Sequence, residues 1–212
     1  MLDRFGYIVV EGPIGVGKSS LARRIADHAG ARLLHENPDE NPFLPRFYDD
    51  IKRHALATQL FFLFQRAQQV QDLVQYDMFA QRTVADFLLD KDLLFARMTL
   101  DDDEFRLYQQ IYDHLKPTAP RPDLVIYLQA PADVLVERVR RRGIRYEQGI
   151  SEAYLRRVAD SYARFFYDYD AAPLLIVNTE NLNFADNDAD FQLLLDKIGH
   201  MRSAREFFNR AG

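Results

Sequence analysis

The feature that most constrains this chain is a glycine-rich segment that directly follows a short apolar run. Residues 7–10 are apolar and mostly β-branched, residues 12–19 match the pattern G-x-x-x-x-G-K-[ST], and residues 20–29 favour a helix. A strand, a loop and a helix in this order predict a phosphate-binding loop. Its glycines let successive backbone N–H groups converge on one anion, which the positive end of the following helix also attracts.

The chemistry expected of this loop is nucleotide binding. We expect Lys18 to reach the β- and γ-phosphates and the Ser19 hydroxyl to ligate Mg²⁺. The alternative is a glycine-rich turn that contains Lys-Ser by chance, and the correct strand and helix on either side disfavour it. The predicted ATP-binding residues of the loop are Gly12, Pro13, Ile14, Gly15, Val16, Gly17, Lys18, Ser19 and Ser20.

Length and composition narrow the class of protein. A chain of 212 residues, 48% of them hydrophobic, fits one medium-sized α/β domain over 1–212. The formal net charge of −5 does not favour a general nucleic-acid binder, which normally has a basic excess. Without cysteine, the chain has no disulfide and no thiolate metal site. No apolar stretch reaches the roughly 18 residues of a membrane span, so we expect a cytoplasmic protein without nucleic-acid or membrane partners.

Predicted strands alternate with predicted helices along the whole chain. Strands are expected at 7–10, 31–35, 82–85, 124–128 and 174–177, and helices at 20–29, 51–75, 87–98, 102–115, from 131, at 152–169 and at 191–198. This alternation is typical of a parallel sheet that helices cover on both faces. The prediction is an α/β P-loop kinase fold with a five-stranded sheet and an arginine-rich lid at about 142–151.

Two carboxylates directly follow predicted strands. Glu36 comes after the second strand and Asp86 after the third. In a parallel sheet the carboxyl ends of the strands face the ligand crevice, so both side chains should point towards the phosphates. One would accept the proton of an attacking hydroxyl, and the other would hold Mg²⁺. Alternatively, each carboxylate only caps the loop or helix that follows it.

The segment 137–147 is dense in arginine and lies where a predicted helix ends. Guanidinium groups that close over a transferring phosphate are a recurrent means of stabilising its charge. We assign Arg142 to the transferring phosphate and Arg140 and Arg145 to ATP, although the sequence does not rank the three. The alternative is a solvated helix face, which some of these arginines certainly form.

Taken together, these landmarks resemble the deoxyribonucleoside kinases of the deoxycytidine/deoxyguanosine kinase type, over nearly the whole chain. The segment His35-Glu36-Asn37-Pro38 resembles the Glu-Pro segment of that family, whose glutamate is the base for the nucleoside 5′-hydroxyl. The resemblance implies that Tyr48 and Glu147 bind the 3′-hydroxyl. It also implies that the base pocket is lined by Gln59, Arg66 and Asp92.

Simpler roles are open for several of these residues. Gln59 could be an exposed helix residue, Arg66 and Asp92 a structural ion pair, and Tyr48 ordinary aromatic packing. The chain also departs from the family, which commonly has Asp/Glu-Arg-Ser after the third strand where this chain has Asp86-Phe87-Leu88. Either another cation, such as Lys91 or a lid arginine, replaces the missing arginine, or the geometry of the site differs.

The function implied is ATP-dependent, Mg²⁺-dependent phosphorylation of the 5′-hydroxyl of a deoxyribonucleoside. Similarity to bacterial members of the family favours deoxyadenosine or deoxyguanosine, with deoxycytidine still open. A thymidylate-kinase-like nucleoside monophosphate kinase is the enzymatic alternative. A nucleotide-binding module without turnover is the alternative from another class of protein.

The long predicted helix at 51–75 also suggests a homodimer. An apolar stripe at helical spacing is formed by Leu56, Leu60, Leu63, Ala67, Val70 and Val74. Phe61, Phe62 and Phe64 widen the apolar surface beyond the arc that one sheet-facing side requires. We expect part of this excess to line the nucleoside pocket and the rest to meet a second copy of the helix. The alternative is a helix buried between the sheet and the helix at 87–98.

Overall fold

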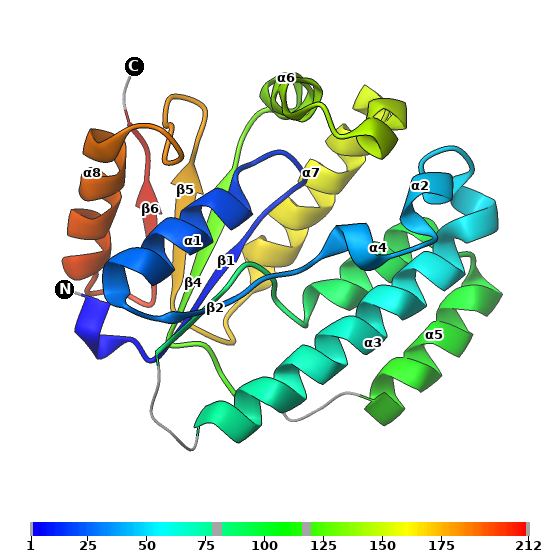
Figure 1. Cartoon of the computed structure of the whole chain (residues 1–212), viewed down its shortest axis with the longest axis horizontal. Helices are drawn as coiled ribbons and strands as arrows, with labels where there is room; N and C mark the ends of the chain where they lie inside the picture. Colours follow the sequence, from blue (N-terminus) through cyan, green and yellow to red (C-terminus); the bar gives the residue numbers. More distant parts are fainter. Residues whose placement is uncertain (1, 78–81, 116–119, 211–212) are drawn as a thin grey trace.

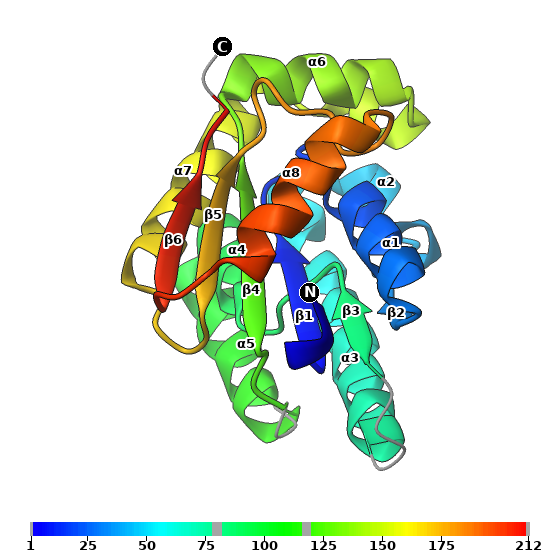
Figure 2. The same cartoon turned by 90° about the vertical axis from the view of Figure 1, so that its left-hand side faces the viewer.

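A parallel sheet forms the centre of the computed structural model, which describes residues 2–77, 82–115 and 120–210. Its strands lie in the order β2-β3-β1-β4-β5-β6, and every neighbouring pair is parallel. Figure 2 shows the strands from β6 to β3 side by side. Their bounds are β1 Tyr7–Glu11, β2 Arg32–Leu34, β3 Thr83–Ala85, β4 Leu124–Gln129, β5 Leu174–Asn178 and β6 Arg205–Phe208.

The prediction of five strands was wrong, because the sheet has a sixth. Strand β6 pairs only with β5 and forms one edge of the sheet. None of its residues is fully buried, and it reads Arg-Glu-Phe-Phe. An edge strand need not carry the continuous apolar run of a central parallel strand, so the sequence pattern that predicts the other strands does not apply to it.

Helices cover both faces of the sheet (Figure 1). The α-helices are α1 Lys18–Ala29, α2 Leu44–Phe47, α3 Ile51–Asp77, α4 Lys91–Thr99, α5 Asp102–Leu115, α6 Ala132–Arg142, α7 Glu152–Asp168 and α8 Asp188–Gly199. Within the described residues, the 3₁₀ helices are η1 Leu2–Arg4, η2 Pro38–Glu40 and η3 Arg145–Gly149. No helix in the described ranges is long and apolar enough to cross a membrane.

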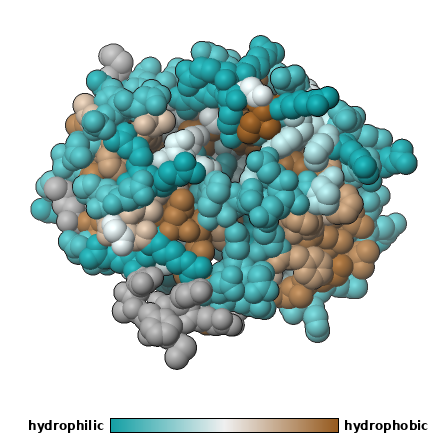
Figure 3. Space-filling view, in the orientation of Figure 1, coloured by the Kyte–Doolittle hydropathy of each residue, from teal (hydrophilic) through white to brown (hydrophobic). Residues whose placement is uncertain are grey.

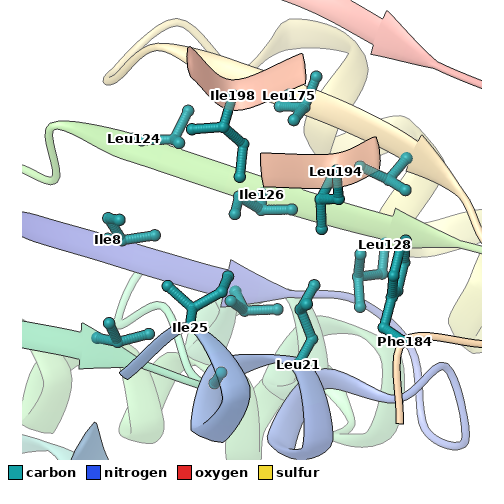
Figure 4. Close-up of a cluster of buried hydrophobic side chains, with 14 of the residues drawn as sticks. Ile8, Leu21, Ile25, Leu124, Ile126, Leu128, Leu175, Phe184, Leu194 and Ile198 are labelled. Atoms are coloured by element: carbon teal, nitrogen blue, oxygen red, sulfur yellow. The ribbon is translucent and has the colours of Figure 1, made fainter. Parts of the chain in front are cut away.

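Alternation along the strands divides the core into two layers. Ile8 and Ile126 point to the face that α1 and α8 cover, where they meet Leu21 and Leu194 (Figure 4). The intervening Val9 belongs to the opposite layer with residues of α3, α4 and α7. Because successive strand side chains point to opposite faces, the apolar runs 8–10 of β1 and 124–128 of β4 supply both layers, and polar residues such as Glu11 and Gln129 come only at the carboxyl ends of these strands.

Helix α4 begins later than the sequence indicates. The prediction began this helix at 87, whereas the structure begins it at Lys91 and leaves residues 86–90 as a loop. The backbone N–H of Leu88 in this loop donates to the buried Glu11 carboxylate, 2.8 Å away. That contact joins residues far apart in the sequence, and it takes the backbone out of helical geometry before Lys91.

Candidate active site

The site lies at the carboxyl ends of β1, β2 and β3, where the phosphate-binding loop, Glu36 and Asp86 come together, as expected for parallel strands. The loop passes very close to the rest of the fold. A Cβ at Gly12, whose φ is +151°, would lie 2.3 Å from the Leu128 carbonyl oxygen. A Cβ at Gly15 (φ +83°) would lie 2.8 Å from a Val139 methyl. Both positions therefore require glycine.

Asp86 connects the phosphate-binding loop to the end of β2. Its Oδ2 accepts a hydrogen bond from Ser19 Oγ at 2.5 Å and lies 2.6 Å from His35 Nδ1. Its Oδ1 accepts from the Glu36 backbone N–H at 2.8 Å. Mg²⁺ is commonly held by one or two protein oxygens together with phosphate oxygens and water. The adjacent Ser19 hydroxyl and Asp86 carboxylate offer that hard oxygen donor set, so the residues present fit Mg²⁺.

Lys18 lies across the loop that contains it. Its Nζ donates to the carbonyl oxygens of Gly12 and Pro13, at 2.7 and 3.2 Å. Burial lowers the pKa of Lys18 to about 8, and nearby carboxylates, Glu11 first among them, only partly offset that effect. At a pH slightly above neutral, a substantial fraction of Lys18 therefore lacks its proton.

The two oxygens of Glu36 have different neighbours. Oε1 accepts hydrogen bonds from two nitrogens of Arg66, one of which, Nε, lies at 2.7 Å. Oε2 lies 3.5 Å from Lys91 Nζ. Burial by itself would raise the pKa of Glu36, but Arg66, Lys91 and Lys18 outweigh it and bring the pKa down to about 2. Glu36 is a carboxylate at any physiological pH.

Arg66 also pairs with Asp92, whose side chain is fully buried. The second carboxylate oxygen of Asp92, Oδ2, has no hydrogen-bond partner among the described residues. Burial raises the pKa of Asp92 to about 6 against the opposing effect of Arg66. A buried acceptor without a partner is costly, and Asp92 is not among the residues that line the cavity described next.

A cavity brings most of the predicted site residues together. Aromatic side chains such as Phe47, Phe62 and Phe95 line it together with a comparable number of charged side chains. Apolar walls combined with convergent polar groups are typical of a small-molecule site. The predicted residues that line it are Ile14, Gly15, Lys18, Ser19, Glu36, Tyr48, Gln59, Arg66, Asp86, Arg142 and Glu147.

Comparison with known proteins decides the family. The model of the deoxynucleoside kinase family matches residues 8–201. The chain belongs to the deoxynucleoside kinase family. It is 31% identical to the deoxyguanosine kinase of Bacillus subtilis (strain 168), over 88% of this chain and 92% of that protein. It is also 31% identical to the deoxyadenosine kinase of Lactobacillus acidophilus, over 85% of this chain and 88% of that protein.

Solved structures show the same fold. The deoxyadenosine kinase from M. mycoides with bound dCMP and dCDP matches with a TM-score of 0.79 at 23% identity, over 92% of this chain and all of that chain. The same kinase with bound dCTP matches with a TM-score of 0.77. The solved structures thus show the fold, whereas the family and the two kinases named above show that this chain phosphorylates a nucleoside.

A second cavity lies on the other side of the phosphate-binding loop of this kinase. It is lined by the loop residues Gly15, Val16, Gly17 and Ser20, by α6, and by the segment after β5. Arg138 connects these walls, because it donates to the Thr179 hydroxyl at 2.8 Å and to its carbonyl oxygen at 2.6 Å. The sequence analysis did not single out Arg138 or residues 179–187. The dense arginine run was the only signal for Arg138.

The arginines of the run 137–147 are placed very differently. Arg142 lines both cavities and pairs with Glu147, with Nε 3.0 Å from a carboxylate oxygen. Arg140 and Arg145 are exposed and line neither cavity. Of the residues predicted to line a base pocket, Gln59 is 4% exposed and lines the first cavity, whereas Asp92 is held behind Arg66 and does not line it.

The segment that follows α6 contacts the segment that follows β2. Tyr146 of η3 donates its hydroxyl proton to Asp39 of η2, at 2.6 Å. Its ring is parallel to that of Tyr48, with the centroids 6.3 Å apart. The views in Figures 1 and 2 show α6 across the end of the sheet towards which the strand arrows point.

The pKa of Lys18 predicts how nucleotide binding depends on pH. As the pH rises through about 8, the ammonium loses its proton, and the attraction to phosphates weakens with it. Bound phosphates raise this pKa, so the affinity for ATP should be nearly constant below about pH 8 and fall above it, by at most about tenfold per pH unit, until the pKa of Lys18 in the complex is reached. Calorimetric titration at a series of pH values measures this.

The matched control is Lys18→Met, which removes the titrating group and leaves a side chain of similar length. This variant should bind ATP weakly at every pH and lose about 10²–10³ in kcat. If the variant keeps the pH dependence of the wild type, another group is responsible for it.

The positions of Glu36 and Asp86 predict different roles for the two carboxylates. Glu36→Gln should lower kcat by about 10²–10⁴, with the KM for nucleoside nearly unchanged, because the amide cannot accept a proton. Asp86→Asn should mainly raise the Mg²⁺ concentration needed for half-maximal rate. Steady-state kinetics with varied nucleoside and varied Mg²⁺ separate the two.

The neighbouring Glu40→Gln is the control, because Glu40 is exposed and lies outside both cavities. It should retain wild-type kinetics. A large loss of kcat in Asp86→Asn together with an active Glu36→Gln would show that the roles are reversed.

Proposed function

We propose that this chain is an ATP-dependent deoxyribonucleoside 5′-kinase that acts on deoxyguanosine or deoxyadenosine. The observation that carries the proposal is that Glu36, Lys18 and Ser19 line one cavity. Glu36 would thus accept the proton of the nucleoside hydroxyl on one side of the moving phosphoryl group. The phosphate-binding loop would hold the phosphates of ATP on the other side.

The donor side of the reaction rests on the phosphate-binding loop. Its backbone N–H groups and Lys18 hold the β- and γ-phosphates of ATP, and Ser19 and Asp86 hold Mg²⁺. When bound, Mg²⁺ neutralises charge on the β- and γ-phosphate oxygens. Arg142, which lines both cavities, would meet the charge of the transferring phosphoryl group. The remainder of ATP would occupy the second cavity beside Arg138.

Glu36 would act on the acceptor hydroxyl. A carboxylate with a pKa of about 2 is a weak base, so it cannot remove a proton from a free alcohol. The transition state of phosphoryl transfer is loose, however, and the hydroxyl proton becomes acidic only as its oxygen bonds to phosphorus. Glu36 would therefore first orient the 5′-hydroxyl and then receive its proton late in the reaction.

The nucleoside would lie in the aromatic cavity. Gln59 offers one donor and one acceptor to a base edge, and Arg66, which Asp92 holds from behind, offers a further donor. Tyr48 and Glu147 would bind the 3′-hydroxyl. The named relatives support a purine, because they are a deoxyguanosine kinase and a deoxyadenosine kinase. Deoxycytidine is the next candidate.

The proposal also includes the domain organisation of the chain. Residues 1–212 would form one nucleoside kinase domain, in which the arginine-rich segment at about 142–151 is the lid. The contact of Tyr146 with Asp39 and Tyr48 supports this, because Tyr48 lines the first cavity. Arg140 and Arg145 would reach ATP only if the lid moves. A cytoplasmic location follows from the substrates, since ATP and free nucleosides are available there.

A phosphorylation panel tests the function. The wild-type protein should convert deoxyguanosine or deoxyadenosine to the monophosphate much faster than it phosphorylates dTMP. Gln59→Ala should raise the KM for the preferred nucleoside and reduce discrimination between bases by about 10-fold or more, because a polar group of the base then lacks a partner. The KM for ATP should not change.

Exposed Gln110 on α5 provides the control, as Gln110→Ala should behave like the wild type. Unchanged base preference in Gln59→Ala would show that Gln59 is structural. Turnover of dTMP without turnover of nucleosides would overturn the proposed function.

A homodimer through α3 is also part of the proposal. Helices α3 and α5 pack together, and each exposes a large apolar side chain, Phe64 at 54% and Leu107 at 47%. Figure 3 shows apolar surface gathered over these two helices. Contiguous exposed apolar surface commonly marks an interface, and two-fold symmetry is the commonest solution.

Light scattering at micromolar protein tests the dimer. The wild type should have twice the chain mass of 24.8 kDa, and Phe64→Glu should be monomeric because it places a charge in the interface. Phe207→Glu, at an exposed position on β6, is the control and should leave the mass unchanged. A monomeric wild type at all concentrations would rule the dimer out.

A further inference from the structure

A buried lysine of α4 lies in the cavity beside Glu36. The Lys91 side chain is 3% exposed, and its Nζ lies 3.3 Å from Glu11 Oε2 and 3.5 Å from Glu36 Oε2. Lysine is almost never fully buried unless it is paired. Phe87 stands where the deoxycytidine/deoxyguanosine kinase type commonly has an arginine, and its side chain is buried in the apolar core. The cation beside Glu36 on this side therefore comes from Lys91.

Glu11 holds this ammonium in place. Its carboxylate is fully buried, and Oε1 accepts from the Gly12 backbone N–H at 2.9 Å and from the Tyr162 hydroxyl at 3.0 Å. Its Oε2 accepts from the Leu88 backbone N–H at 2.8 Å. Two of these donors are backbone groups, so the carboxylate has little freedom to move. Lys91 is therefore tied to the first residue of the phosphate-binding loop through one rigid group.

The two carboxylate oxygens of Glu36 differ in how free they are to bind a substrate hydroxyl. Arg66 occupies Oε1 with two hydrogen bonds, whereas the Lys91 ammonium approaches Oε2 only to 3.5 Å, longer than a normal hydrogen bond. At that distance the positive charge attracts the carboxylate without occupying its lone pairs. Oε2 is thus the oxygen that stays available to a substrate hydroxyl.

We propose that Lys91, anchored by Glu11, is a positioning residue of the phosphoryl transfer that holds Oε2 of Glu36 towards the nucleoside 5′-hydroxyl. Arg66 of α3 binds Oε1 through hydrogen bonds, and the charge of Lys91 of α4 attracts Oε2, so rotation of the carboxylate away from this orientation is opposed at both oxygens. This role deepens the proposed function and rests on it. A purely structural lysine, in contrast, would only neutralise Glu11.

The test exploits the absence of cysteine from the chain. Lys91→Cys introduces a single thiol, which 2-bromoethylamine converts into a side chain with an ammonium near the original position. Iodoacetamide converts the same thiol into a neutral side chain and provides the matched control. Both forms, together with the wild type and Lys91→Met, are assayed with the preferred deoxyribonucleoside, and their folding is followed by thermal unfolding.

Loss of the ammonium should lower kcat by about 10²–10³ and change the nucleoside KM by less than about threefold. This applies to Lys91→Met and to the neutral adduct. The aminoethylated protein should recover at least about tenfold in kcat over the neutral adduct. The exposed Lys52→Met on α3 should retain the wild-type kcat.

Three outcomes would overturn the role of Lys91 in an enzyme that phosphorylates nucleosides. These are a kcat of Lys91→Met within about threefold of the wild type, equal kcat for the two adducts in folded protein, or a change in KM alone. A wild-type protein that phosphorylates no deoxyribonucleoside would instead overturn the proposed function, and this role with it. The two failures are therefore distinguishable.

Discussion

Charge buried at the carboxyl edge of the sheet is the constraint on which the site depends. Glu11 and Asp92 are fully buried, and each faces a cation, Lys91 and Arg66 respectively. Removing one partner of such a pair leaves an uncompensated charge, which typically costs about 3–5 kcal/mol. The network therefore holds α3, α4 and the phosphate-binding loop in one arrangement. The cavity keeps its shape because moving one charged residue would leave its buried partner without a counter-charge.

The strand order explains why these groups meet. Strand β1 lies between β3 and β4, so the phosphate-binding loop rises at the centre of the sheet rather than at an edge. The residues that follow β2 and β3 then approach the loop from one side, while α6 and the segment after β5 approach it from the other. The two cavities lie on these two sides. Arg142 lines both of them, and Lys18 lines the first.

Much of the arrangement of the site was predictable from short sequence patterns. The phosphate-binding loop has a fixed spacing of glycines, Lys18 and Ser19, and the central strands are continuous apolar runs. Glu36 and Asp86 were found because a residue that directly follows a parallel strand must lie at the ligand edge. The base-pocket residues rested on family resemblance, and the structure places Gln59 and Arg66 at the first cavity.

What the sequence by itself determined is therefore the fold class, the phosphate-binding loop and the two carboxylates beside it, since each depends on residues close together in the chain. Only the tertiary structure decided the edge strand β6, the late start of α4 at Lys91 and the contact of Arg138 with Thr179. These features depend on pairings between distant residues, such as Glu11 with Leu88. A buried polar side chain needs a hydrogen-bond partner, but its sequence position does not identify that partner, which the packing of distant segments supplies.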